Sequence, residues 1–284
     1  MKFVRHVKKP GWGVGRVLKD DGGDVLTYFE AVGPIRLRKS LAQLEDVPDE
    51  DIGESDILRH LRPDEKGNFA APPLTFEEMV QNFIRIEGGG FEQPRYLAQE
   101  REYKDKAVEM AADLLGKARL TKALREGNFA AIFEAYKKVV QATNLLSIFE
   151  KARLTSLPAA NYRALAEVLV DLLAGEGLIG PRFDRLAETF LDLGIGSWPT
   201  CTYGLFVTDP ATHLVVKPMF VQRAAKALGY EISYKAHPTA ETYERILNFA
   251  SYLREKLTKR GMVPRDMIDV QGFIWLGTGG ADGV

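Results

Sequence analysis

The sequence predicts a mainly helical protein that begins with a small β-barrel. Residues 1–47 consist of short apolar or alternating segments separated by glycine, proline and aspartate turns, which is typical of strands with tight connections. From residue 74 to residue 284, apolar residues recur about every 3.6 positions, the spacing of amphipathic helices. An acidic stretch that contains proline and glycine, residues 48–73, separates the two patterns and predicts a linker.

The N-terminal strands are predicted from their β-branched and aromatic residues. The sequence Asp-Asp-Gly-Gly at residues 20–23 is a strong turn signal, and Gly33-Pro34 marks a second turn. Four or five short strands in fifty residues predict a small curled barrel. The clearest segments are residues 3–4, 14–18, 25–29 and 35–38.

The stretches GWGVGRV and VLTYFEAVGPIRL carry a resemblance to known modules. They resemble the Tudor-like (SH3-like) module at the C-terminus of UvrD-type helicases and the polymerase-interacting domain of CarD-like proteins. The resemblance covers about 45 residues. It implies a non-catalytic module that binds protein or lies beside nucleic acid.

The glycines of GWGVG precede a predicted strand, whereas a phosphate-binding loop precedes a helix, so they are interpreted as turn residues. The head also carries basic side chains that could contact phosphates or could equally form a solvated surface. The candidate DNA-binding residues here are Lys8, Lys9, Arg16, Arg36 and Arg38.

The helices of residues 74–284 are predicted from capping signals and periodicity. Thr75 and Glu78 form a capping-box pattern, and Gly88-Gly89-Gly90 ends the helix that they start. One long amphipathic helix is expected from Arg95 to Leu115. Further helices are expected near residues 117–125, 128–140, 143–153, 159–174, 181–193, 199–207, 218–228, 239–259 and 264–276.

The stretch LDLGIGSWPTCTYGLF predicts two helices joined by a Gly-Ile-Gly turn. It resembles the hairpin of helix-hairpin-helix DNA glycosylases of the endonuclease III type, in which the start of the second helix holds a DNA phosphate. This resemblance implies DNA contacts by Gly194, Gly196, Ser197 and Trp198, and by Arg223, which matches an arginine of that family. In this sequence Val216, Lys217 and Pro218 occupy the place of the family's catalytic aspartate, and its cluster-binding cysteines are absent.

A second resemblance covers about 140 residues, from Asn144 to Leu276. The sequences NLLSIFEKARL and DMIDVQGFIWL, at its two ends, are similar to a helical region of McrB-type restriction proteins. That resemblance implies an accessory or DNA-sensing role in restriction or phage defence.

Three residues are candidates for catalysis. Asp266 and Asp269 are spaced to share one helical face, where paired carboxylates could bind a metal or share a proton, or could cap the helix. Lys217 follows two valines and could contact phosphate, act as an amine nucleophile, or be an ordinary exposed lysine. Trp275 is predicted to be a core residue, with base stacking as the alternative.

The composition excludes several other classes. The only cysteine is Cys201, so neither a disulfide nor a zinc cluster is possible within one chain, and a reducing, cytoplasmic compartment is expected. His213 and His237 lack metal-ligand spacing, so no metal and no cofactor is predicted. The charged N-terminus is not a signal peptide, and no membrane span is expected.

Together these features predict an intracellular nucleic-acid-binding protein of DNA repair or phage defence. DNA is the expected partner, and a protein partner for the N-terminal module is possible. The first alternative is an active base-excision glycosylase that uses Lys217 or an aspartate of the last helix. The second is a non-catalytic adaptor with no DNA contact.

Overall fold

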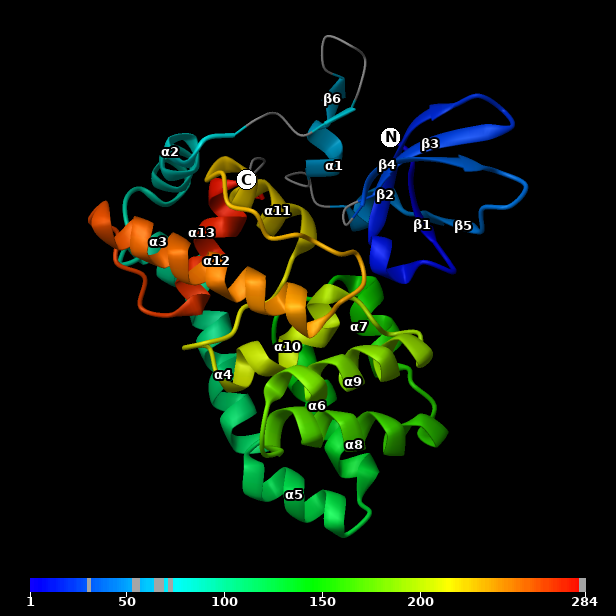
Figure 1. Cartoon of the computed structure of the whole chain (residues 1–284), viewed down its shortest axis with the longest axis vertical. Helices are drawn as coiled ribbons and strands as arrows, with labels where there is room; N and C mark the ends of the chain where they lie inside the picture. Colours follow the sequence, from blue (N-terminus) through cyan, green and yellow to red (C-terminus); the bar gives the residue numbers. More distant parts are fainter. Residues whose placement is uncertain (30–31, 53–56, 64–68, 71–73, 281–284) are drawn as a thin grey trace. The chain divides into compact units, whose positions relative to one another are not determined.

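The structure is a computed structural model, and it describes residues 1–29, 32–52, 57–63, 69–70 and 74–280 (Figure 1). It is mainly helical, with a five-stranded antiparallel sheet at the N-terminus, as the sequence predicted. Within the described residues, no helix is both long and apolar enough to cross a membrane.

The sheet has the strand order β4-β3-β2-β1-β5. It is open, because β4 and β5 form its edges and the described residues show no pairing between them. The small curled barrel that the sequence predicted would need that pairing, so the described residues show its strands as an open sheet. The strands are β1 (Phe3–His6), β2 (Val14–Asp20), β3 (Asp24–Phe29), β4 (Gly33–Arg38) and β5 (Leu44–Val47).

One face of the sheet forms a small core around Phe29, which is fully buried. Gly15 is required opposite this ring, because a Cβ atom there would lie 2.6 Å from both Phe29 and Thr27. The indole of Trp12 packs on the same ring at 5.2 Å, and His6 packs on Trp12 at 5.1 Å. Buried and partly exposed positions alternate along β3, as the strand periodicity requires.

Short elements follow the sheet, and the helices occupy the rest of the chain (Figure 1). The short elements are α1 (Ile57–His60), β6 (Arg62–Pro63) and β7 (Phe69–Ala70). The helices are α2 (Phe76–Glu87), α3 (Pro94–Tyr96), α4 (Glu102–Leu114), α5 (Lys117–Arg125), α6 (Phe129–Gln141), α7 (Ile148–Thr155), α8 (Tyr162–Ala174), α9 (Ile179–Asp192), α10 (Trp198–Thr208), α11 (Pro218–Ala227), α12 (Ala240–Lys259) and α13 (Met267–Gly277).

Most helix positions agree with those expected from the sequence, and two differ. The helix expected near residues 143–153 begins only at Ile148. The expected helix from Arg95 to Leu115 is divided into α3, a π-helical turn (Leu97–Arg101) and α4. A π turn inserts an extra residue into the helix and rotates the side chains that follow it. Arg101 is the last residue of this turn, and its side chain is buried.

The chain forms two compact units, each made of separate segments. One contains residues 1–86, residues 217–236 and the chain from Phe273 onward. The other contains residues 87–216 and 237–272. The predicted linker, residues 48–73, falls partly on residues 53–56, 64–68 and 71–73, which lie outside the described residues, so its mobility stays a prediction.

The core of the second unit is built around α10. Every residue of this helix from Trp198 to Val207 is buried, and the helix packs against α4, α8 and α9 (Figure 1). Its stretch WPTCTYGLFV contains no charged residue, which is typical of a helix that is covered on all sides.

Candidate functional site

The acidic pair of α13 lies at the start of the helix. Asp266 caps it, because its Oδ1 accepts hydrogen bonds from the backbone N–H of Ile268 at 2.9 Å and of Asp269 at 3.4 Å. The capping interpretation of the sequence is thus confirmed for Asp266. Asp269 is fully buried, so its charge must be compensated within the protein.

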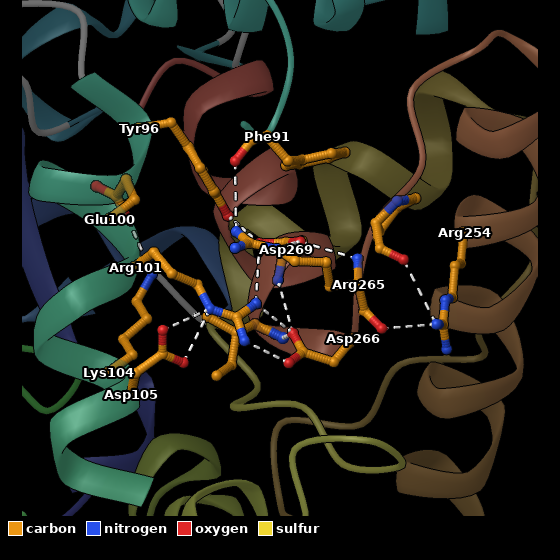
Figure 2. Close-up of polar contacts among 12 residues, drawn as sticks. Phe91, Tyr96, Glu100, Arg101, Lys104, Asp105, Arg254, Arg265, Asp266 and Asp269 are labelled. Atoms are coloured by element: carbon orange, nitrogen blue, oxygen red, sulfur yellow. Dashed lines mark hydrogen bonds and ion pairs between the residues drawn. The ribbon is translucent and has the colours of Figure 1, made fainter. Parts of the chain in front are cut away.

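Two arginines and a tyrosine supply that compensation (Figure 2). Arg101 holds Asp266 with two hydrogen bonds of 2.7 and 2.6 Å and reaches Asp269 at 3.1 Å. Arg265 donates to Asp269 from its backbone N–H, its Nε and a terminal nitrogen, at 2.9 to 3.0 Å. Tyr96 donates its hydroxyl to the same carboxylate at 3.0 Å. We call Tyr96, Arg101, Arg265, Asp266 and Asp269 the arginine–carboxylate cluster.

The electrostatics of this cluster keep Asp269 and Arg101 charged and Tyr96 neutral. Burial alone would raise the pKa of Asp269, but hydrogen bonds from Arg265 and the charges of Arg101 and Arg265 outweigh burial and lower it. Burial opposes the charge of Arg101, yet its bonds to Asp266 and Asp105 raise its pKa. Burial, followed by the negative charge of Asp269, raises the pKa of Tyr96.

A general base must accept a proton with a free lone pair and a suitable pKa. Asp269 accepts five hydrogen bonds and has a lowered pKa, which makes it a weak base. The catalytic role predicted for Asp266 and Asp269 stays a prediction, and the contacts give both side chains an anchoring role. In the described part of the chain, no group of His, Cys, Asp or Glu side chains could hold a metal ion.

A second group of buried charges lies on α2, the π-helical turn and α4. Lys104 is 1% exposed and donates to Glu100 at 2.9 Å. Glu87, the last residue of α2, is 3% exposed, and its Oε2 has no hydrogen-bond partner among the described residues. Burial and the nearby Glu100 raise the pKa of Glu87, although Arg95 opposes this shift.

The Gly-Ile-Gly turn joins α9 to α10 as predicted. Gly194 has a φ of 73°, and a Cβ atom at Gly196 would lie 2.7 Å from the backbone nitrogen of Leu191. Ser197 caps α10 and donates its hydroxyl to Glu150 at 2.5 Å. A carboxylate therefore already occupies the region where the resemblance to glycosylases implies a DNA phosphate.

Trp198 is 1% exposed and packs beside the rings of Phe183 and Tyr243, which stack on each other. A DNA contact by its ring, as implied by the hairpin resemblance, would require the side chain to leave the core. Its indole instead fills the space between α9, α10 and α12. No feature of the sequence placed Glu150 beside this turn, because the two are 47 residues apart.

Lys217 and Arg223 belong to the other compact unit, where Lys217 directly precedes α11 and Arg223 lies within it. The ammonium of Lys217 lies 5.6 Å from the centre of the Trp275 ring. Trp275 itself is partly exposed and packs on Phe220 at 4.5 Å. Arg223 donates to the backbone oxygen of Thr278 at 2.6 Å and so holds the end of α13.

The basic residues of the sheet fall into two groups. Arg16 donates to the backbone oxygens of Leu58 and Arg59, and Arg36 pairs with Asp21 at 3.2 Å. The contacts of Arg16 are partly buried, whereas the pair of Arg36 and Asp21 is exposed. The side chains of Lys8, Lys9 and Arg38 are exposed.

The sequence signals for the buried charges were present but local. Glu100 with Lys104, and Arg101 with Asp105, are spaced for ion pairs along a helix, and both pairs form.

Comparisons with known protein families, with curated proteins and with solved structures find no match for this chain.

Proposed function

We propose that the protein binds nucleic acid through residues 217–236, which we call the basic segment. It carries four basic residues and one acidic residue, Glu231, so its formal net charge is +3, whereas that of the whole chain is −1. A local excess of positive charge is the electrostatic footprint of a surface that binds phosphates. This concentration of charge is the observation that carries the proposal. The basic residues are Lys217, Arg223, Lys226 and Lys235.

The exposed lysines of the basic segment are suited to phosphate contact. Lys226 and Lys235 are exposed, so they can meet a phosphate without first being removed from a core. Lys217 stands at the N-cap of α11, which has no side-chain cap. The positive end of the helix dipole and this ammonium favour an anion at the same place.

Arg223 contributes positive charge but is also an anchor. Its bond to Thr278 means that a substitution there would change both the charge and the end of α13. We therefore test phosphate binding with variants of the lysines, and we assign Arg223 a supporting role.

The sheet supports a second contact, as a Tudor-like module for a partner protein or for nucleic acid. Strand β5 returns to pair with β1, and this five-stranded antiparallel sheet supports the proposal of such a module. The exposed side chains of Lys8, Lys9 and Arg38 add positive charge to the same compact unit. The resemblances to helicase modules and to restriction proteins favour a role in DNA repair or phage defence.

The test is fluorescence anisotropy with a labelled oligonucleotide across a salt series from about 50 to about 200 mM. Affinity should fall steeply with salt, and the removal of one phosphate-binding lysine should reduce the slope by about 0.7 to 0.9. The double variant Lys226→Gln/Lys235→Gln removes two lysines and should reduce the slope by about 1.4 to 1.8. Lys217→Ala should weaken binding by roughly 1 kcal/mol. The matched control is Arg119→Gln/Lys122→Gln, two exposed basic residues of α5 in the other unit. Binding that ignores salt, or that the control pair weakens equally, would contradict the proposal.

A further variant separates the basic segment from the Gly-Ile-Gly turn. Glu150→Gln removes the negative charge beside Ser197 and keeps the shape of the side chain. If the turn bound a phosphate, this change should strengthen binding, because a repulsive charge disappears. Binding by the basic segment predicts an unchanged affinity.

A further inference from the structure

The basic segment ends in an irregular loop, residues 229–236, with an unusual backbone. Ser233 has a φ of 45°, and within the described residues it is the one residue other than glycine with a positive φ. The carboxylate of Glu231 holds this conformation by accepting a hydrogen bond from the backbone N–H of Ser233 at 2.6 Å. Such conformations persist only where surrounding contacts enforce them, and they concentrate at functional sites.

The loop is fixed at both ends and in its middle. Tyr230 donates its backbone N–H to the oxygen of Ala225 at 2.9 Å, which ties the loop to the end of α11. Ile232 is 5% exposed and anchors the centre. The hydroxyl oxygen of Tyr234 is also buried, so this ring is held by its far end. The loop therefore has a defined conformation that its contacts maintain.

Two tyrosines lie between two lysines along this part of the chain. Tyr230 and Tyr234 are partly exposed, while Lys226 and Lys235 are exposed on either side of them. Proteins that bind single-stranded nucleic acid combine these two features, because unpaired bases stack on aromatic rings and lysines contact the phosphates. In a duplex the base faces are already stacked on one another and are closed to such rings.

We propose that the basic segment binds single-stranded nucleic acid, with Tyr230 and Tyr234 stacking on unpaired bases and Lys226 and Lys235 contacting the backbone. This inference rests on the proposed function and adds the class of nucleic acid to it. The strained backbone at Ser233 then serves to hold the two tyrosines in place before the strand arrives. Rings that are fixed in advance lose less conformational entropy on binding.

The test compares a labelled oligo(dT) of about 12 nucleotides with a dT·dA duplex of the same length. The single strand should bind more tightly. Tyr230→Ala and Tyr234→Ala should each weaken single-strand binding about 5- to 140-fold, the equivalent of one base–aromatic stack, and should leave duplex binding unchanged. Tyr234→Phe keeps the ring and should keep the affinity. The matched control is Tyr252→Ala, a partly exposed tyrosine of α12 with Lys256 near its ring at 5.5 Å.

Each other outcome has a definite meaning. Equal or tighter binding of the duplex, with no effect of the tyrosine variants, overturns the inference and leaves the proposed function standing. Failure of both oligonucleotides to bind overturns the proposed function and the inference with it. A loss of affinity in Tyr234→Phe as large as in Tyr234→Ala, with unchanged circular dichroism, shows that the hydroxyl anchor matters and not the ring, and this also overturns the stacking role.

Discussion

Arg101→Met should destabilise the protein strongly, because it removes the shared partner of two carboxylates. Asp269 is fully buried, the Asp266 side chain is 18% exposed, and Arg101 contacts both. Removing one partner of a buried ion pair leaves an uncompensated charge and costs about 3–5 kcal/mol. Asp105 adds little to this figure, because its side chain is 43% exposed and water can replace the arginine there.

The assay is urea denaturation followed by fluorescence and circular dichroism. With an m-value of about 2–3 kcal/mol/M, the expected loss of stability moves the midpoint down by about 1–2.5 M. The control is Arg245→Met, which breaks an exposed pair with Glu241 in which the side chains are 45% and 58% exposed. That pair should contribute about 0.3–0.5 kcal/mol.

The destabilisation caused by Arg101→Met should depend on pH in one direction. The folded protein lowers the pKa of Asp269, so its ionised carboxylate contributes stability above the ordinary pKa, and this is lost as pH falls through the lowered pKa. The variant keeps Arg265 and loses only the part of this contribution that the charge of Arg101 provides. The difference between wild type and variant should therefore be largest near neutral pH and shrink towards acid pH. A difference that grows towards acid pH, or one no larger than that of Arg245→Met, would refute the reasoning.

Three further predictions rest on single side chains. Burial and Glu100 raise the pKa of Glu87. The contribution of Glu87 to stability is therefore full below its ordinary pKa and is lost as pH rises through the raised value. Glu87→Gln should abolish this loss, which is measured as the shift of the urea midpoint from about pH 4 to about pH 7. Trp275→Ala should lower stability by about 3 kcal/mol, the low end for a large aromatic because the ring is partly exposed, and a melting curve that does not move would favour a stacking role instead. Burial raises the pKa of Cys201 to about 12, although a hydrogen bond with Thr200 opposes this shift. The thiol should therefore react with Ellman's reagent only in denaturant. Rapid reaction of the native protein would contradict the burial of Cys201.

The helices could be predicted because their signals are local. Thr75 and Glu78 form the capping box that the sequence indicated, and α5 has the predicted bounds of residues 117–125. Gly194 likewise adopts the left-handed conformation that a turn between helices needs. Each of these features depends on residues within a few positions of one another, so the sequence contains all the information.

The sequence predicted the carboxylates of the arginine–carboxylate cluster but not their distant arginine partner. The spacing of Asp266 and Asp269 gave a shared face and a cap, but the partner Arg101 lies 165 positions away from Asp266. The π-helical turn that rotates Arg101 has no signal in the apolar periodicity. The same limit applies to Trp198, because a Gly-Ile-Gly turn specifies how the backbone bends and not whether the next side chain meets solvent or a core.

The geometry at the start of α13 explains why this chain uses charges where apolar side chains could also pack. Apolar contacts are non-directional, so a helix held by them alone can settle in several rotations about its axis. The bonds from Arg101 and Arg265 to the carboxylates of α13 are directional and are satisfied in one rotation. Gly272 fits the same rotation, because a Cβ atom there would lie 2.6 Å from the hydroxyl of Tyr96, which donates to Asp269. The buried charges therefore select one rotation of this helix, and the small residue one turn further on lets the tyrosine approach closely enough to complete the set of hydrogen bonds.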